Sequence, residues 1–312
     1  MANNMKYIRI FSIVVTGMLI LTSCGQSYEE TKRLSREQRL KMAREDSAAL
    51  KIALMPTLDC LPIYIAKDHQ LFDTIVDIRL KRYTAQMDCD TAMMRGRVEG
   101  MVTDLVRAER IIQLGTPMKY VATTNAYWLL ISNRNQRITQ LKHLDDKMLA
   151  MTRYSVTDFL GDLVVDSAKL KTERVFRIQV NDVYVRLKML ENNEMDAMLL
   201  TEPQATQALL KKHKVLLDTR KEDIQMGVIA FREKGMDDQN RKKQKEVFLK
   251  GYNDACDSIN KFGVRHYKDV IRKYYTISEP ALKSLPDTLK YNHAEAPRQK
   301  DVERAQQWLS KK

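Results

Sequence analysis

The sequence lacks the groups that most catalytic and metal centres require. Its four cysteines form no CxxC pair and its five histidines no HxxxH-type pair, so zinc and thioredoxin-like chemistry have no support. No Ser-His-Asp order and no glycine-rich phosphate loop is present. Nor is there an apolar run of about 20 residues, the length that a membrane-spanning helix needs. These absences argue against an enzyme, a metal site and a membrane-spanning protein.

The excess of basic residues is spread along the chain. The net charge of +13 comes from 53 Lys and Arg interspersed with 40 Asp and Glu. A basic balance can favour nucleic acid or anionic solutes, but no nucleic-acid motif accompanies it. We therefore expect solvated surface charge and no nucleic-acid partner.

The beginning of the chain has the pattern of a signal peptide. Lys6 and Arg9 precede a short apolar run over residues 10–21, and small residues follow it. The ending Leu21-Thr22-Ser23-Cys24 resembles a bacterial lipobox, in which the cysteine becomes the lipidated first residue. We predict a lipoprotein signal peptide over residues 1–23, lipidation at Cys24, and an extracytoplasmic, membrane-anchored chain in the periplasm or on the cell surface. An ordinary signal peptide followed by a chance cysteine is the alternative.

Residues 24–50 are polar and charged and predict a tether, partly helical, that has no apolar face for a core. After it, short apolar strands alternate with helical segments in two similar series, one from Lys51 and one from Met148. This alternation predicts an α/β fold with parallel sheets covered on both faces. The predicted strands are 52–55, 75–83, 100–103, 120–123, 127–132, 148–152, 176–180, 197–200 and 226–232.

Three segments carry a resemblance to a known family. Ile52-Ala53-Leu54-Met55-Pro56-Thr57, followed by Leu61-Pro62-Ile63-Tyr64-Ile65-Ala66-Lys67, resembles the opening of type II solute-binding proteins of ABC importers. Residues 94–104 resemble the family's passage of helix, Gly, acidic residue, strand and small polar residue, and residues 190–203 repeat that passage in the second lobe and end in the group's Glu202-Pro203. The nearest group includes thiamine-precursor, nitrate and sulfonate binders.

The resemblance implies a two-lobed fold with two crossover strands at a hinge, near residues 125–127 and 223–226. Lobe 1 would comprise residues 51–125 and 225–312, and lobe 2 residues 126–224. Such a protein, a monomer without a cofactor, captures a small solute between its lobes and delivers it to the membrane subunits of an importer. An enzyme on the same fold, similar to menaquinone- or thiamine-pathway enzymes, and a transporter-independent sensor or interaction lipoprotein are the alternatives.

Candidate ligand-binding residues follow from position, because ligands of open α/β sheets bind outside the carboxyl ends of the strands. Arg153 could grip a carboxylate, phosphate or sulfonate with two hydrogen bonds, or could be a solvated surface residue. The three candidate aspartates could bind an amine or cap helices. Tyr127 and Trp128 straddle a crossing strand, so one could stack on a flat ligand while the other packs in the core. Whether the ligand is anionic or heterocyclic stays open. The candidates are Thr57, Leu58, Asp59, Gln86, Asp88, Thr103, Asp104, Tyr127, Arg153, Tyr154, Ser155, Thr201 and Glu202.

Three cysteines remain after Cys24. Cys60 and Cys89 begin helices at the same predicted sheet edge, where an oxidising compartment would permit a disulfide. Two separate thiols are the alternative. Cys256 lies in an apolar helical stripe and is expected to be a small core residue.

Overall fold

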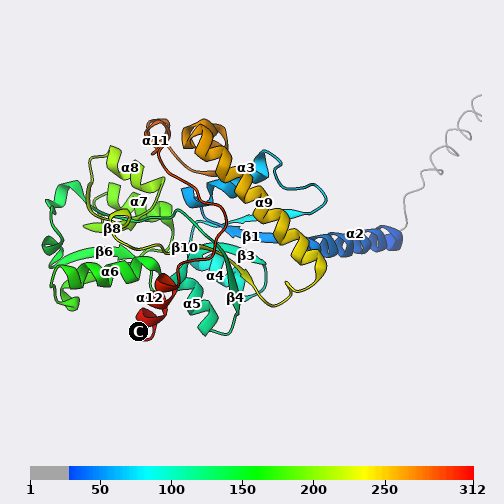
Figure 1. Cartoon of the computed structure of the whole chain (residues 1–312), viewed down its shortest axis with the longest axis horizontal. Coiled ribbons are helices and arrows are strands. Elements are labelled where there is room, and N and C mark those ends of the chain that lie inside the picture. The colour runs from blue at the N-terminus through cyan, green and yellow to red at the C-terminus, as the bar shows by residue number, and fades with distance from the viewer. Residues whose placement is uncertain (1–27) are drawn as a thin grey trace, which may run out of the picture. The chain divides into compact units, whose positions relative to one another are not determined.

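The computed structural model describes residues 28–312 (Figure 1). The predicted signal peptide and Cys24 lie outside the described residues. Most of the predicted tether forms helix α2 (Tyr28–Ala48), whose described side chains are mostly exposed. This helix belongs to a unit separate from the body of the protein, Leu50–Lys312. None of the helices over residues 28–312 is both long and apolar enough to cross a membrane.

The first sheet of the body has the strand order β2-β1-β3-β10-β4. Strand β1, which lies between β2 and β3, has five buried residues, as its apolar sequence predicts. Strands β2, β1 and β3 are parallel, whereas β10 runs antiparallel to both β3 and β4. The strands are β1 (Leu50–Leu54), β2 (Ile78–Arg82), β3 (Gly100–Asp104), β4 (Met118–Thr123) and β10 (Gly227–Arg232).

The second sheet has the order β7-β6-β8-β5-β9, and here β5 runs antiparallel to β8 and β9. The expectation of purely parallel sheets is therefore wrong, because each sheet contains one strand that arrives from the other sheet and pairs in the opposite direction. The strands are β5 (Leu129–Ser132), β6 (Lys147–Met151), β7 (Val175–Gln179), β8 (Ala197–Leu200) and β9 (Lys214–Asp218), of which β9 was not predicted.

Helices follow most strands. Asp88 does not cap a helix: α4 begins at Gln86 after Ala85, so the exposed Asp88 lies within its first turn. The predicted cap at Asp104 is confirmed, since its side chain accepts a hydrogen bond from the Arg107 amide (3.0 Å). The helices are α3 (Leu61–Asp68), α4 (Gln86–Met94), α5 (Leu105–Gln113), α6 (Val156–Ser167), α7 (Val183–Glu191), α8 (Gln204–Leu210), α9 (Gln239–Phe262), α10 (Lys268–Tyr274), α11 (Glu279–Ser284) and α12 (Gln299–Leu309).

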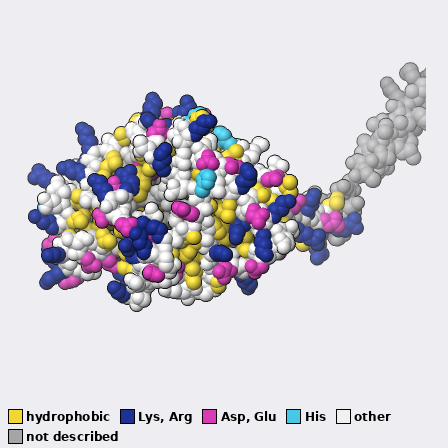
Figure 2. All heavy atoms as spheres, viewed as in Figure 1, with side chains coloured by type: hydrophobic (Ala, Val, Ile, Leu, Met, Phe, Trp, Pro, Cys, Tyr) yellow, Lys and Arg dark blue, Asp and Glu magenta, His cyan; other side chains and the backbone are white. Residues whose placement is uncertain are grey.

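The chain crosses between the two sheets twice, over residues 124–128 and 219–226. We refer to the elements around the first sheet as the first lobe and to those around the second sheet as the second lobe; the exact lobe bounds given above stay a prediction. The last helix, α12, packs against α5 of the first lobe and lies close to α6 of the second (Figure 1). On the face that Figure 2 shows, basic and acidic side chains of the body are interspersed.

Candidate functional site

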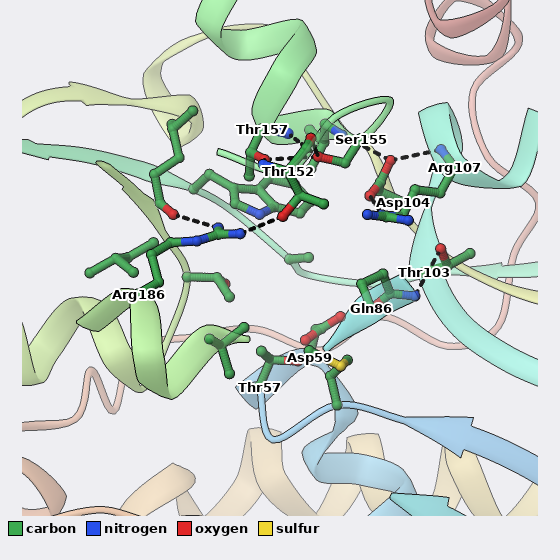
Figure 3. A pocket seen from close by; sticks show the side chains of 18 of the residues that line it. Thr57, Asp59, Gln86, Thr103, Asp104, Arg107, Thr152, Ser155, Thr157 and Arg186 are labelled. Carbon is green, nitrogen blue, oxygen red and sulfur yellow. Dashed lines mark hydrogen bonds and ion pairs between the residues drawn. The ribbon is translucent and has the colours of Figure 1, made fainter. Parts of the chain in front are cut away.

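A cavity of about 90 Å³ lies between the two lobes (Figure 3). It has room for roughly six water molecules, which is the scale of a small solute. Both lobes contribute to its wall, mainly from residues that follow the carboxyl ends of strands or begin helices. The polar and charged lining residues are Thr57, Asp59, Gln86, Thr103, Asp104 and Arg107 from the first lobe, and Thr152, Ser155, Thr157, Asn181, Arg186, Thr201 and Gln204 from the second.

Seven of the residues selected from sequence line this cavity: Thr57, Asp59, Gln86, Thr103, Asp104, Ser155 and Thr201. They lie together because the carboxyl ends of parallel neighbouring strands meet at one edge of a sheet. Their participation in ligand binding stays a prediction.

Three other candidates lie outside the cavity lining because they belong to the core or to the surface. Leu58 is buried in the hydrophobic core. Asp88 is exposed on α4. Arg153 is exposed in the turn before α6 and does not line the cavity.

The remaining three candidates also lie outside the lining and take part in structural contacts. The Tyr127 hydroxyl donates a hydrogen bond to Glu202 Oε1 (2.8 Å), and both residues are buried. The Tyr154 ring packs under the guanidinium of Arg110, 3.4 Å from its centroid. Of the two adjacent aromatics, Trp128 lines the cavity while Tyr127 does not.

Arg107, which sequence analysis missed, is one of two buried arginines in the cavity wall. Its side chain is only 5% exposed, forms a hydrogen-bonded ion pair with Asp90, and has its Nε 3.9 Å from Asp104 Oδ2. Its Nε and Nη2 have no hydrogen-bond partner. Burial raises the pKa of Asp104 to about 6, although the nearby Arg107 opposes this rise.

Arg186 of α7, also missed, is the second buried arginine, with 6% of its surface exposed. It donates hydrogen bonds to the Thr152 hydroxyl (2.6 Å) and to the backbone carbonyls of Val180 (2.6 Å) and Leu199 (3.1 Å). All of these acceptors are uncharged. Burial lowers the pKa of Arg186 to about 10, which leaves it protonated at neutral pH.

A short hydroxyl network orders the second-lobe wall at the start of α6. Ser155 Oγ accepts from the Thr157 amide (3.1 Å) and donates to the Thr152 carbonyl (2.6 Å). Thr157 Oγ1 in turn accepts from the Thr152 amide (2.9 Å). This cap fixes the amino end of α6 toward the cavity, where its positive dipole end favours negative charge.

Hydrogen bonds around the cavity join the two lobes. Asp104 Oδ1 accepts from the Val156 amide at the start of α6 (3.0 Å), and Gln204 Nε2 donates to the Pro56 carbonyl (3.1 Å). The Leu58 amide donates to the Glu202 carbonyl (2.9 Å). The structure therefore has the lobes in contact over the cavity, which is the arrangement of a closed state.

The two missed arginines carry a sequence signal. Arg107 and Arg186 are each within the first four residues of a helix, after the capping residues Asp104 and Asp182. A cation there meets the positive end of the helix dipole, which is unfavourable on an ordinary helix. An arginine at such a position, behind a predicted strand, could have been selected as a site residue.

Cys60, Cys89 and Cys256 are free, buried thiols, so the proposed Cys60–Cys89 disulfide is not formed in the structure. Burial raises the pKa of all three thiols, that of Cys256 to about 12. Cys256 lies in the core as expected. Within residues 28–312, no cluster of three or more His, Cys, Asp or Glu could hold a metal ion.

Comparison with known proteins identifies the fold. No family model and no curated protein sequence matches this chain. Among solved structures, it is similar to the ligand-binding component of an ABC-type import system from Staphylococcus aureus, solved with zinc bound (TM-score 0.69, 17% identity, 84% of this chain and 91% of that one). It is also similar to the aliphatic sulphonate-binding protein SsuA of Escherichia coli (TM-score 0.68, 16% identity, 84% of this chain and 92% of that one). A third similar structure is the nitrate-binding protein NrtA of Synechocystis PCC 6803 (TM-score 0.65, 15% identity, 80% of this chain and 74% of that one).

These similarities extend over most of the chain at low identity, so they define its architecture. The protein has the α/β fold of periplasmic substrate-binding proteins, and the predicted fold class is confirmed.

Proposed function

We propose that this protein is an extracytoplasmic, lipid-anchored solute-binding protein that captures a small solute between its lobes and delivers it to an ABC importer. The observation that carries the proposal is the cavity between the lobes, whose wall contains a buried arginine with only uncharged hydrogen-bond acceptors. The likeness to binding components of import systems supports it.

Capture follows from the bonds that cross the cavity. A solute that contacts both walls stabilises the closed arrangement of the lobes relative to an open one. The importer subunits would then recognise the closed form. The cavity is built for binding and positioning, because its hydroxyls are held in helix caps and in bonds to backbone carbonyls.

Binding is tested by thermal unfolding of the purified full chain in mild detergent with a panel of amino acids, sulfonates, nitrate, pyrimidines and vitamins. A ligand of the folded state at a hundredfold excess over its dissociation constant adds about 2.7 kcal/mol of stability and raises the midpoint. Arg186→Lys should weaken binding at least tenfold because the planar fork is lost, whereas Arg153→Lys, outside the cavity, should leave it unchanged. If no compound of the panel raises the midpoint of unfolding, the result would contradict solute capture and favour a sensor or interaction role.

The anchor is tested separately. Intact-mass measurement of the membrane-extracted protein should find acylation at Cys24, and Cys24→Ser should release the chain from membranes. A Cys24→Ser chain that fractionates with membranes as the original does would refute the lipid anchor.

A further inference from the structure

Four charged side chains line the cavity, and two of them already have opposite charges nearby. Arg107 forms an ion pair with Asp90 and lies near Asp104, so this cation and these carboxylates offset one another. Asp104 is further occupied by the amides of Arg107 and Val156. This group of charges belongs to the protein's own interlobe contacts.

The other two, Asp59 and Arg186, have no oppositely charged side chain within 4.0 Å among the described residues. Arg186 bonds only to uncharged oxygens, as described above. Asp59, which is half-buried, accepts a long hydrogen bond from the Thr124 hydroxyl (3.4 Å). Burial raises the pKa of Asp59, and hydrogen bonds from the side chains of Thr57 and Thr124 and from the backbone at Asp59 and Cys60 only partly oppose this rise. A buried charge that has no opposite charge beside it costs several kcal/mol, so a ligand anion at Arg186 would recover part of that cost, and an ammonium group would supply the opposite charge that the half-buried Asp59 lacks.

These two charges come from opposite walls of one cavity. Asp59 follows β1 in the first lobe and Arg186 projects from α7 in the second, and Figure 3 shows both side chains pointing toward the middle of the cavity. We propose that the ligand is a small zwitterion, with its ammonium group beside Asp59 and its carboxylate or sulfonate group at Arg186. This inference rests on the proposed function and names its substrate class.

The same pair of charges provides selectivity. A simple anion would pair with Arg186 but would bring a negative charge into a small cavity that also holds Asp59. A simple amine would be repelled by Arg186 in the same way. Only a ligand with both charges can form an ion pair with each wall of the cavity. Because these two ion pairs involve different lobes, they also stabilise the closed arrangement.

The test uses matched triads titrated calorimetrically into the full chain in mild detergent. Each triad joins a zwitterion to the anion that lacks its amino group and the amine that lacks its acid group: 2-aminoethanesulfonate, ethanesulfonate and ethylamine; 3-aminopropanoate, propanoate and ethylamine; glycine, acetate and methylamine. At least one zwitterion should bind ten times or more tightly than both matched partners. Asp59→Asn should lower the affinity for that zwitterion at least tenfold and remove most of its advantage over the anion. Asp88→Asn, an exposed aspartate outside the cavity, should change neither.

The triads in the original chain need no variant, so a folding defect in Asp59→Asn cannot hide the answer. A matched anion or amine that binds as tightly as every zwitterion would overturn the proposal, as would a complete lack of binding by all the zwitterions. If an anion binds and Arg186→Lys weakens it, solute capture survives and only the zwitterion inference fails. If no compound of the wider panel stabilises the protein against thermal unfolding either, the proposed function fails too.

Discussion

The last helix provides a contact between the lobes that lies away from the ligand cavity. α12 packs on α5 of the first lobe, while Trp308 Nε1 donates a hydrogen bond to Asp162 Oδ2 on α6 of the second (2.7 Å). The Trp308 ring also meets Phe159 edge-to-face, with ring centroids 6.2 Å apart. Trp308→Phe removes the donor and keeps an aromatic ring, so it isolates the hydrogen bond.

The free energy lost in Trp308→Phe follows from the strength of the hydrogen bond between Trp308 and Asp162. A hydrogen bond to a charged acceptor contributes about 1.5–3 kcal/mol, but Trp308 is half-buried and Asp162 keeps Arg177 and Lys312 as partners. We therefore expect a loss of about 1 kcal/mol. If the bond forms only when the lobes are closed, the ratio of closed to open molecules should fall about fivefold, and the apparent ligand affinity should fall in proportion to the loss of the closed fraction.

Energy transfer between dyes on the two lobes measures this ratio. Lys171→Cys and Lys242→Cys place dyes at exposed positions, and Cys60, Cys89 and Cys256 are buried. The matched control is Gln306→Ala, which removes a hydrogen bond from α12 to Glu109 within the first lobe (2.9 Å). It should destabilise the fold without changing the transfer efficiency. Equal efficiencies for Trp308→Phe and the original chain, or an equal shift in the control, would refute the reasoning.

Two further predictions concern titratable groups. Because the pKa of Asp104 is raised to about 6 in the folded chain, the stability linked to its protonation is lost as the pH rises from about 4 to about 6. Asp104→Asn avoids that loss, so the variant's free energy of unfolding relative to the original chain should rise over this range in urea denaturation, and a constant difference would contradict the buried-carboxylate argument. Cys60, Cys89 and Cys256 should resist iodoacetamide in the folded state and react fully in denaturant, because burial raises their pKa values and blocks access. Mass spectrometry that finds rapid native labelling of any of the three would show that its site opens.

Much of the architecture could be predicted because it depends on local patterns. The apolar run at β1 and the cap at Asp104 are readable from a few neighbouring residues. The rule that ligands lie beyond the carboxyl ends of strands then selected lining residues such as Thr57, Thr103 and Ser155 without a structure. The antiparallel strands β5 and β10 could not be predicted in this way, because the direction of a strand within a sheet depends on which distant strands it joins.

The arginines show most clearly that position along the chain cannot identify every cavity residue. Arg153 follows a predicted strand and Arg186 lies within a helix, so position along the chain favoured Arg153. In the structure Arg153 is exposed, whereas Arg186 is buried against the carbonyls of Val180 and Leu199 at the ends of β7 and β8. Those carbonyls are brought to α7 by the sheet, and no neighbour in sequence indicates them.

The sequence by itself determined the alternating elements, the two-lobed plan and the edge of each sheet that carries polar residues, because hydrophobic periodicity and helix capping act over a few residues. Only the tertiary structure decided which charges share the cavity. Asp59 and Arg186 are separated by more than a hundred residues, and they line the same cavity because the chain crosses between the two lobes. Whether a charge is buried and whether it has a partner are set by groups far apart in the chain.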